Sequence, residues 1–319
     1  MEFPDIAAAF ERCLTEIGKV LVGQQELVEG TLVALLSEGN VLIEGVPGLG
    51  KTLLVTTLSR VLSCKFKRIQ FTPDLMPSDI TGHSVYDMNE RKFTFSPGPL
   101  FTNLLLADEV NRAPAKTQSA LLEAMQERQV TVDGETFRLT RPFITIATQN
   151  PLEQEGTYPL PEAQLDRFMF KLIVDYPAPT QELEILRQYA AGKDNRQLDQ
   201  FDVQSVLTGE QVVQIQQKIR EVIAEESILK YITDIVIQTR NWHSVEVGAS
   251  PRASVNLLLG ARALAACYGR NFVVPDDVKQ LAPWVLRHRL RLKPEAEIEG
   301  TAVDEVIREV LDSVEAPQP

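Results

Sequence analysis

The stretch Gly45-Val46-Pro47-Gly48-Leu49-Gly50-Lys51-Thr52 decides the fold of this chain. It matches the pattern G-x-x-x-x-G-K-[ST], in which glycines let backbone N–H groups turn inward around an anion. The helix that starts there adds the positive end of its dipole. Lys51 can reach the β- and γ-phosphates of a nucleotide, and the Thr52 hydroxyl can bind Mg²⁺. The alternative is a glycine-rich turn with an incidental lysine, which the surrounding sequence disfavours.

The flanking segments predict a strand before this loop, at Asn40–Glu44, and a helix after it, at Leu53–Leu58. Further short apolar runs alternate with helical patterns up to about residue 178. Such alternation is typical of an α/β domain with a parallel sheet. The further strands are predicted at Lys67–Phe71, Leu104–Ala107, Phe143–Ala147 and Phe170–Val174.

Two hairpins are predicted within this α/β region, at Val85–Phe95 and at Val130–Phe137. Asp133-Gly134 in the second hairpin is a strong short-range turn signal. Pro177-Ala178-Pro179 marks a predicted boundary between a core, residues 1–178, and a smaller helical domain, residues 179–319. Helical spacing of apolar residues beyond it predicts helices at Gln211–Ala224, Leu229–Thr239, Ser254–Tyr268 and Pro275–His288.

Composition narrows the class of protein. The chain has 319 residues, of which 44% are hydrophobic and 24% charged, which is ordinary for a globular protein. No apolar run is long enough to span a bilayer, and the three cysteines are scattered, which favours a reducing, cytoplasmic setting. The formal net charge of −12 makes nucleic acid an improbable partner, because phosphate binding needs a basic surface.

The apolar strand at Leu104–Ala107 ends in two acids, Asp108 and Glu109. Hydrolysis of a nucleotide needs a carboxylate near Mg²⁺ and a base that deprotonates water. We assign the first role to Asp108 and the second to Glu109. Asn150 follows another apolar strand, and its amide can lie between the γ-phosphate and the attacking water. The alternative for Asn150 is a plain exit from strand to turn, since Asn-Pro favours turns.

Three arginine positions have competing interpretations. Arg167 precedes a predicted strand and suits a γ-phosphate transition state, in the same chain or in a neighbouring one; the alternative is an ion pair with Asp166 or Glu162. Arg252 begins a helix in the second domain and can lie over the nucleotide from the lid side; the alternative is a solvated charge in the first turn. The residues alone favour the alternative, because a cation is unfavourable at the positive end of a helix unless an anion lies nearby. The basic run Leu286–Arg291 is interpreted as a solvated helix end rather than a nucleic-acid site.

Taken together, these segments resemble the MoxR family of AAA+ ATPases over nearly the whole chain. The resemblance rests on Gly45–Thr52, Ala107–Met125, Ala147–Pro151, Glu155–Phe168, Gly248–Ala253 and Val285–Leu290.

The resemblance implies an AAA+ P-loop NTPase core with two inserted hairpins, followed by an all-α lid domain. Lys51 and Thr52 resemble the Walker A pair, Asp108 and Glu109 the Walker B pair, and Asn150 sensor 1. Arg167 resembles the arginine finger and Arg252 sensor 2, for which bound phosphate supplies the missing anion. The residues then expected around ATP or ADP are Val22, Gly23, Gly45, Pro47, Gly48, Leu49, Gly50, Lys51, Thr52, Leu53, Asp108 and Arg252, with Mg²⁺ on Thr52 and Asp108.

The family also implies a ring, most often a hexamer, in which Arg167 of one subunit completes the site of the next. It implies a chaperone-like role in assembly, activation or cofactor insertion of a protein client, with a von Willebrand factor A domain protein as partner. Two alternatives remain at this point. One is a nucleic-acid motor of a related AAA+ branch, and the other is a nucleotide-gated scaffold in which slow hydrolysis only times assembly.

Overall fold

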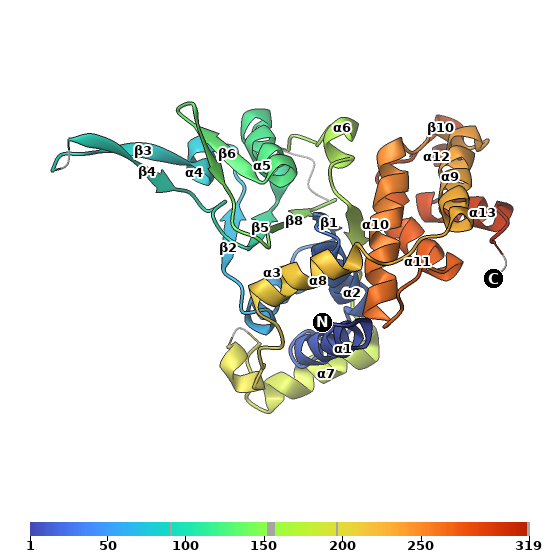
Figure 1. Cartoon of the computed structure of the whole chain (residues 1–319), viewed down its shortest axis with the longest axis horizontal. Coiled ribbons are helices and arrows are strands. Elements are labelled where there is room, and N and C mark those ends of the chain that lie inside the picture. The colour runs from blue at the N-terminus through green and yellow to red at the C-terminus, as the bar shows by residue number, and fades with distance from the viewer. Residues whose placement is uncertain (90, 152–156, 196, 318–319) are drawn as a thin grey trace.

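A central parallel sheet organises the computed structural model, which describes residues 1–89, 91–151, 157–195 and 197–317 (Figure 1). Its strands lie in the order β2-β5-β8-β1-β9 and all neighbours are parallel. The predicted strands are confirmed within a few residues. They are β1 (Val41–Glu44), β2 (Phe66–Gln70), β5 (Leu104–Asp108), β8 (Ile144–Gln149) and β9 (Phe170–Ile173).

Helices around the sheet pack through apolar stripes. In α1 (Phe3–Gly18), the buried residues Ile6, Phe10, Cys13 and Ile17 recur at helical spacing. This helix packs against α2 (Gln25–Leu36), α3 (Lys51–Val61) and α10 (Pro251–Cys267). The connection after β9 includes Pro177 and leads into α7, which begins at Pro179. The other helices before that connection are α4 (Pro77–Thr81), η1 (Val110–Arg112), α5 (Ala115–Glu127) and α6 (Glu162–Leu165).

Both predicted hairpins are present: β3 (Gly82–Asp87) pairs with β4 (Lys92–Pro97), and β6 (Gln129–Val132) with β7 (Glu135–Arg138). They contact each other, because Phe95 stacks on Phe137 with ring centroids 4.0 Å apart. Ser84 also donates a 2.6 Å hydrogen bond to Asp133 in the turn of the second hairpin. The β3–β4 hairpin extends well away from the body of the molecule (Figure 1).

The C-terminal region is helical apart from one short antiparallel pair, β10 (Val245–Val247) with β11 (Arg291–Leu292). Strands of three and two residues are too short to show an alternating pattern in sequence. The helical elements are α7 (Pro179–Ala190), η2 (Leu198–Phe201), α8 (Gly209–Ile219), α9 (Glu226–Asn241), α10 (Pro251–Cys267), α11 (Pro275–Leu286), α12 (Pro294–Ile298) and α13 (Val303–Ser313).

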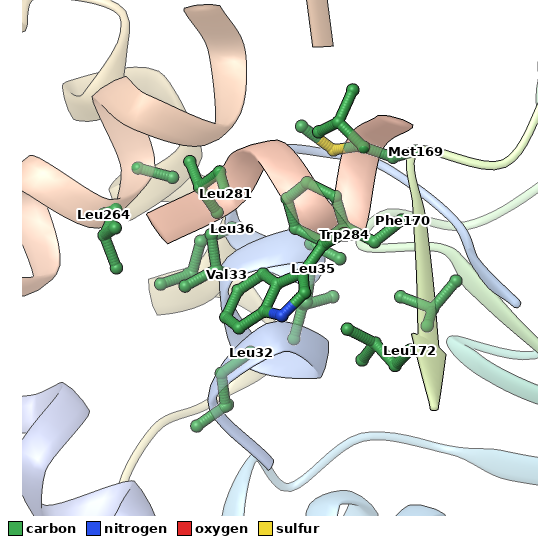
Figure 2. Close-up of a cluster of buried hydrophobic side chains, with 14 of the residues drawn as sticks. Leu32, Val33, Leu35, Leu36, Met169, Phe170, Leu172, Leu264, Leu281 and Trp284 are labelled. Carbon is green, nitrogen blue, oxygen red and sulfur yellow. The ribbon is translucent and has the colours of Figure 1, made fainter. Parts of the chain in front are cut away.

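The sheet and the helical region share one hydrophobic core. Figure 2 shows side chains of α2, β9, α10 and α11 packed together, and Phe170 meets the Trp284 ring edge-on at 5.6 Å. The indole N–H of Trp284 is satisfied by Glu26, at 2.6 Å. The boundary at residue 178 stays a prediction. Within the described residues, no helix is both long and apolar enough to cross a membrane.

Candidate active site

The loop between β1 and α3 has the backbone expected of an anion cradle. Gly48 and Gly50 adopt φ angles of +88° and +83°, which residues with a side chain rarely adopt. Helix α3 begins directly at Lys51, so the N–H groups of its first turn lie at the loop. The Lys51 ammonium donates a hydrogen bond to the Gly45 carbonyl and is thereby folded back across the loop.

Polar residues from three further strands, β2, β5 and β8, meet this loop because the carboxyl ends of parallel strands share one edge of the sheet. In the register, Gln70 lies opposite Asp108, and Glu44 opposite Gln149. A cleft of about 620 Å³ opens at this edge. Its lining residues are Pro47, Gly48, Gly50, Lys51, Thr52, Leu53, Thr56, Arg68, Asp108, Glu109, Thr148, Asn150, Tyr189, Asn195 and Leu198.

A threonine hydroxyl links the two acids. Thr148 Oγ1 donates to Asp108 Oδ1 at 2.5 Å and accepts from the backbone N–H of Glu109 at 2.9 Å. The other Asp108 oxygen accepts from Arg68 Nη2 at 2.6 Å. Asp108 is therefore fixed in orientation from two sides, as a residue that positions a metal or its water must be.

Glu109 is held separately from its neighbour. Its Oε2 accepts hydrogen bonds from Gln70 Nε2 at 2.7 Å and from Arg112 Nη1 at 2.8 Å. Its backbone lies in the left-handed region, with φ 57° and ψ 50°, which costs a residue with a side chain on the order of 1–3 kcal/mol. This conformation points Glu109 away from the course of β5, and such strain is concentrated at functional sites.

The charge state of Lys51 depends on this arrangement. Burial lowers the pKa of Lys51, and the opposite charges of Asp108, Glu109 and Glu44 act against that shift. The lysine and the two acids thus share one cleft and influence each other electrostatically. A bound phosphate would add negative charge beside the Lys51 ammonium and favour its protonated form.

The remaining residues predicted for the site lie in three places. Asn150 is only 7% exposed and lines the cleft beyond the end of β8. Val22 and Gly23 are not among the residues that line the cleft, and Gly23 lies beside α7, because a Cβ built on it would come 2.5 Å from Gln181 Oε1. Gly45 and Leu49 belong to the loop but are not among the residues that line the cleft.

Both candidate arginines lie outside this cleft. Arg167 sits in the turn between α6 and β9 and is partly exposed. Among the described residues, Asp166 and Glu162 form their ion pairs with other arginines and not with Arg167. Arg252 is 45% exposed through its side chain, and its Nη1 lies 3.5 Å from Asp166 Oδ2. The chain therefore brings the phosphate loop, both acids and Asn150 together, and leaves the two arginines apart.

Comparison with known proteins agrees with this geometry. Residues 40–170 match the model of the ATPase family associated with various cellular activities, and residues 237–310 match the AAA lid domain. The chain is 46% identical to chaperone MoxR1 of Mycobacterium tuberculosis, over 97% of this chain and 82% of that protein. It is also 46% identical to the uncharacterized protein YeaC of Bacillus subtilis, over 98% and 96% of the two chains. The chain belongs to the MoxR family of AAA+ ATPases.

A solved structure shares the whole architecture. A Cytophaga hutchinsonii protein, provisionally assigned as an ATPase, superposes with a TM-score of 0.90 at 42% identity. The match covers 99% of this chain and 97% of that one. The AAA+ core and the helical C-terminal region are therefore shared with that protein. One part of the family-like segments, Glu155-Gly156, lies outside the described residues.

The interpretation of the basic run Leu286–Arg291 as a solvated helix end was wrong for its central residues. Arg289 is 8% exposed and His288 is 9% exposed, whereas Arg291 lies at the surface. Burial lowers the pKa of His288 well below its usual range, with the charge of Arg289 as a second cause. The sequence pattern misled because periodicity cannot show that an acid more than 100 positions away will meet a buried arginine.

The donor set of the cleft fits magnesium bound through a nucleotide. Within the described residues, no group of three or more His, Cys, Asp or Glu side chains is arranged to hold a metal. Mg²⁺ commonly binds through one or two protein oxygens together with substrate phosphates and water. The Thr52 hydroxyl and the Asp108 carboxylate, both lining the cleft, provide such oxygens.

Sequence reasoning missed the partners that orient the two acids. Arg68 and Gln70 occupy alternate positions of β2, so their side chains lie on the same face of the sheet, where they reach Asp108 and Glu109 of the neighbouring strand end. Thr148 was part of a recognised segment, but no role was assigned to it. Two polar residues spaced i, i+2 in a strand otherwise expected to be buried are the available signal. That signal does not show that Arg68 contacts Asp108 and Gln70 contacts Glu109.

Proposed function

We propose that this MoxR-family chain hydrolyses ATP to ADP with the help of Mg²⁺ and uses the cycle to remodel a protein partner. The single observation that carries the proposal is the common cleft of Lys51, Asp108 and Glu109 at the edge of the sheet. A phosphate cradle, an oriented carboxylate and a separate candidate base are the parts that phosphoryl transfer to water requires.

Each side chain has a distinct task in this proposal. Lys51 and the N-terminus of α3 bind the phosphates, and Thr52 and Asp108 hold Mg²⁺, which neutralises phosphate charge when bound. Glu109 takes a proton from the attacking water, and the Asn150 amide orients that water. Gln70 and Arg112 both donate to the Oε2 atom of this carboxylate, so in this proposal the proton goes to Oε1.

The positions of the arginines support assembly into a ring, which we propose to be hexameric. Phosphoryl transfer benefits from an arginine at the γ-phosphate, yet Arg167 and Arg252 lie outside the cleft of their own chain. An arginine supplied by the neighbouring subunit meets this need. Nucleotide binding and subunit contact then depend on each other.

The likeness to a protein described as a chaperone, MoxR1, supports a chaperone-like role in the assembly, activation or cofactor insertion of a client. We propose a cytoplasmic client protein, with a von Willebrand factor A domain protein as adaptor. The exposed aromatic residues of the β3–β4 hairpin, Tyr86 and Phe93, offer a surface for protein contact. The net charge of −12 disfavours a nucleic-acid motor.

The decisive variant is Glu109→Gln, which keeps the shape of the side chain and removes the base. Loss of a general base costs typically 10²–10⁴-fold, so we expect ATP turnover to fall by about that factor while ATP still binds. The measurement is steady-state phosphate release together with nucleotide affinity, with Lys51→Ala as the variant that impairs binding. Near-normal turnover by Glu109→Gln would remove Glu109 from this role.

The same variant identifies the partner. Affinity-tagged Glu109→Gln, held with ATP, is used for capture and mass spectrometry, with Lys51→Ala as the control. A protein captured only by the ATP-bound variant, whose addition changes ATP turnover of the unmodified protein, supports remodelling. Capture of nucleic acid with salt-sensitive stimulation of turnover favours a motor on DNA or RNA, and turnover that stays slow with every captured protein favours a nucleotide-gated scaffold.

A further inference from the structure

Arg289 is a buried residue to which the catalytic scheme above gives no task. It lies after α11 in the helical region, yet its guanidinium reaches the turn between α6 and β9. Its Nε donates to Asp166 Oδ1 at 2.7 Å. A buried guanidinium needs a partner for its charge and for its N–H groups, and Asp166 supplies the charge.

The other N–H groups of Arg289 bind the backbone on both sides of Arg167. Nη2 donates to the Asp166 carbonyl at 3.0 Å and to the Phe168 carbonyl at 2.7 Å. Nη1 donates to the Met169 carbonyl at 3.3 Å. The carbonyls of Asp166 and Phe168, the two residues that flank Arg167, are thus both held by one planar, rigid group that lies 123 and 121 positions further along the chain.

A second contact to the same turn comes from the neighbouring histidine. His288 Nε2 lies 3.2 Å from the Phe168 carbonyl, and burial keeps the imidazole neutral by lowering its pKa. The Asp166 carboxylate is in turn shared with α10, because Ser250 Oγ donates to it at 3.1 Å and Arg252 approaches it at 3.5 Å. The turn carrying Arg167 is therefore joined to two helices of the C-terminal region.

We propose that Arg289 is the positioning residue for Arg167: it fixes the turn from which Arg167 reaches the nucleotide of the neighbouring subunit and connects that turn to the helical region. The inference rests on the proposed function, in which Arg167 acts across the subunit interface. Arg289 itself touches no reacting atom. Its effect is on where Arg167 stands, and a shift of about 1 Å in a catalytic group can cost on the order of a hundredfold in rate.

The test uses Arg289→Met in the full-length protein, with Arg287→Met as matched control. Arg287 is also largely buried, with 8% of its side chain exposed against 2% for Arg289, and it also joins the helical region to the sheet. It pairs with Asp304 at 2.8 Å and donates to the Lys171 carbonyl, away from Arg167. We expect Arg289→Met to lower kcat about tenfold to a hundredfold with KM for ATP within about threefold, and Arg287→Met to leave kcat nearly unchanged.

Mixing of subunits separates positioning from loss of structure. A Lys51→Ala subunit has a defective cleft of its own and an intact Arg167, so it can serve the intact cleft of an Arg289→Met neighbour. We expect addition of Lys51→Ala protein to raise the turnover of Arg289→Met several-fold, as it should for Arg167→Ala. Arg289→Lys keeps the charge but has fewer donors, so its kcat should lie between those of the unmodified protein and of Arg289→Met.

Three results would overturn the inference: wild-type kcat in Arg289→Met, an equal loss in Arg287→Met, or a loss that Lys51→Ala subunits do not restore although they restore Arg167→Ala. If Arg289→Met does not fold, Arg289→Lys against Arg287→Lys decides on the same terms. Failure of the proposed function has a different signature, since Arg167→Ala itself would then keep its activity or gain nothing from Lys51→Ala. That result would also remove the inference.

Discussion

The phosphate side of the cleft and the turn that carries Arg167 are built in different ways. On the phosphate side, the loop residues Gly48 to Thr52 are contiguous, and their backbone alone forms the cradle. At the turn, Arg289 binds the carbonyls of the two residues that flank Arg167, and Arg289 itself follows α11 in the helical region. The first region is local and the second depends on packing between the sheet and the helical region.

This difference suggests how control over hydrolysis is divided. The backbone of the loop is set by residues that are adjacent in the chain, while the helical region adds Tyr189, Asn195 and Leu198 to the lining of the same cleft. Asp166, by contrast, contacts Arg289, Ser250 and Arg252 at once, so any movement of the helical region changes what the chain offers its neighbour. Three variants test this division, beginning with the largest expected effect.

Arg252→Ala tests the contacts between the helical region and the turn that carries Arg167. Arg252 lies outside its own cleft, and its contact with Asp166 is long and half-exposed, so the free energy of unfolding should change by less than about 1 kcal/mol. If Arg252 serves the neighbouring site, ATP turnover should fall on the order of a hundredfold. Phosphate release and thermal unfolding are the measurements.

Addition of Lys51→Ala subunits should restore part of the activity of Arg252→Ala. Without restoration, Arg252 acts on the nucleotide of its own chain, and the helical region must move towards the cleft for it to do so. That outcome would weaken the contrast between the two regions.

Thr148→Val tests the phosphate side. Removal of the hydroxyl deprives Asp108 of a donor and leaves the Glu109 N–H without its acceptor, a loss of about 1–3 kcal/mol. We expect ATP turnover to fall about tenfold, measured at saturating ATP.

Thr145→Val in the same strand is the matched control. The Thr145 hydroxyl is buried without a hydrogen-bond partner, so its replacement should leave turnover unchanged and stability unchanged or higher. Equal loss of activity in both variants would show that β8 tolerates no valine, and would count against a specific role for Thr148.

Lys51→Met should have the smallest effect of the three variants. It acts on the free energy of unfolding and tests the electrostatics of the phosphate loop. Burial lowers the pKa of Lys51, so the charged lysine destabilises the nucleotide-free fold at every pH below the lowered pKa. That penalty fades as pH rises through the lowered pKa towards the pKa of a lysine in the unfolded chain. The variant should therefore gain about 1 kcal/mol or less at neutral pH, and the gain should shrink at alkaline pH.

Chemical unfolding of the nucleotide-free protein at several pH values measures this difference, with the exposed Lys65→Met as control. A gain that grows with pH would contradict the sign of the pKa shift. A loss of stability at neutral pH would show that the hydrogen bond from Lys51 to the Gly45 carbonyl outweighs the burial of its charge.

Much of the fold follows from local sequence. The strands before and after the phosphate loop are short and bounded by turn residues, all but β2 are mainly apolar, and each lies within a few positions of its predicted range. The acids at the end of β5 were identifiable for the same reason, since residues that directly follow a buried parallel strand must lie at its carboxyl edge. The order β2-β5-β8-β1-β9 was not predicted, because strand neighbours are chosen by packing.

The sequence by itself determined the phosphate loop, the pair Asp108 and Glu109, and the family, because each depends on residues that are adjacent or nearly adjacent in the chain. Only the tertiary structure decided which partners these residues have. Arg68 and Thr148 each meet Asp108 across 40 positions, and Arg289 meets Asp166 across 123. Such contacts satisfy buried charges and N–H groups, and that requirement arises only once the core has excluded water.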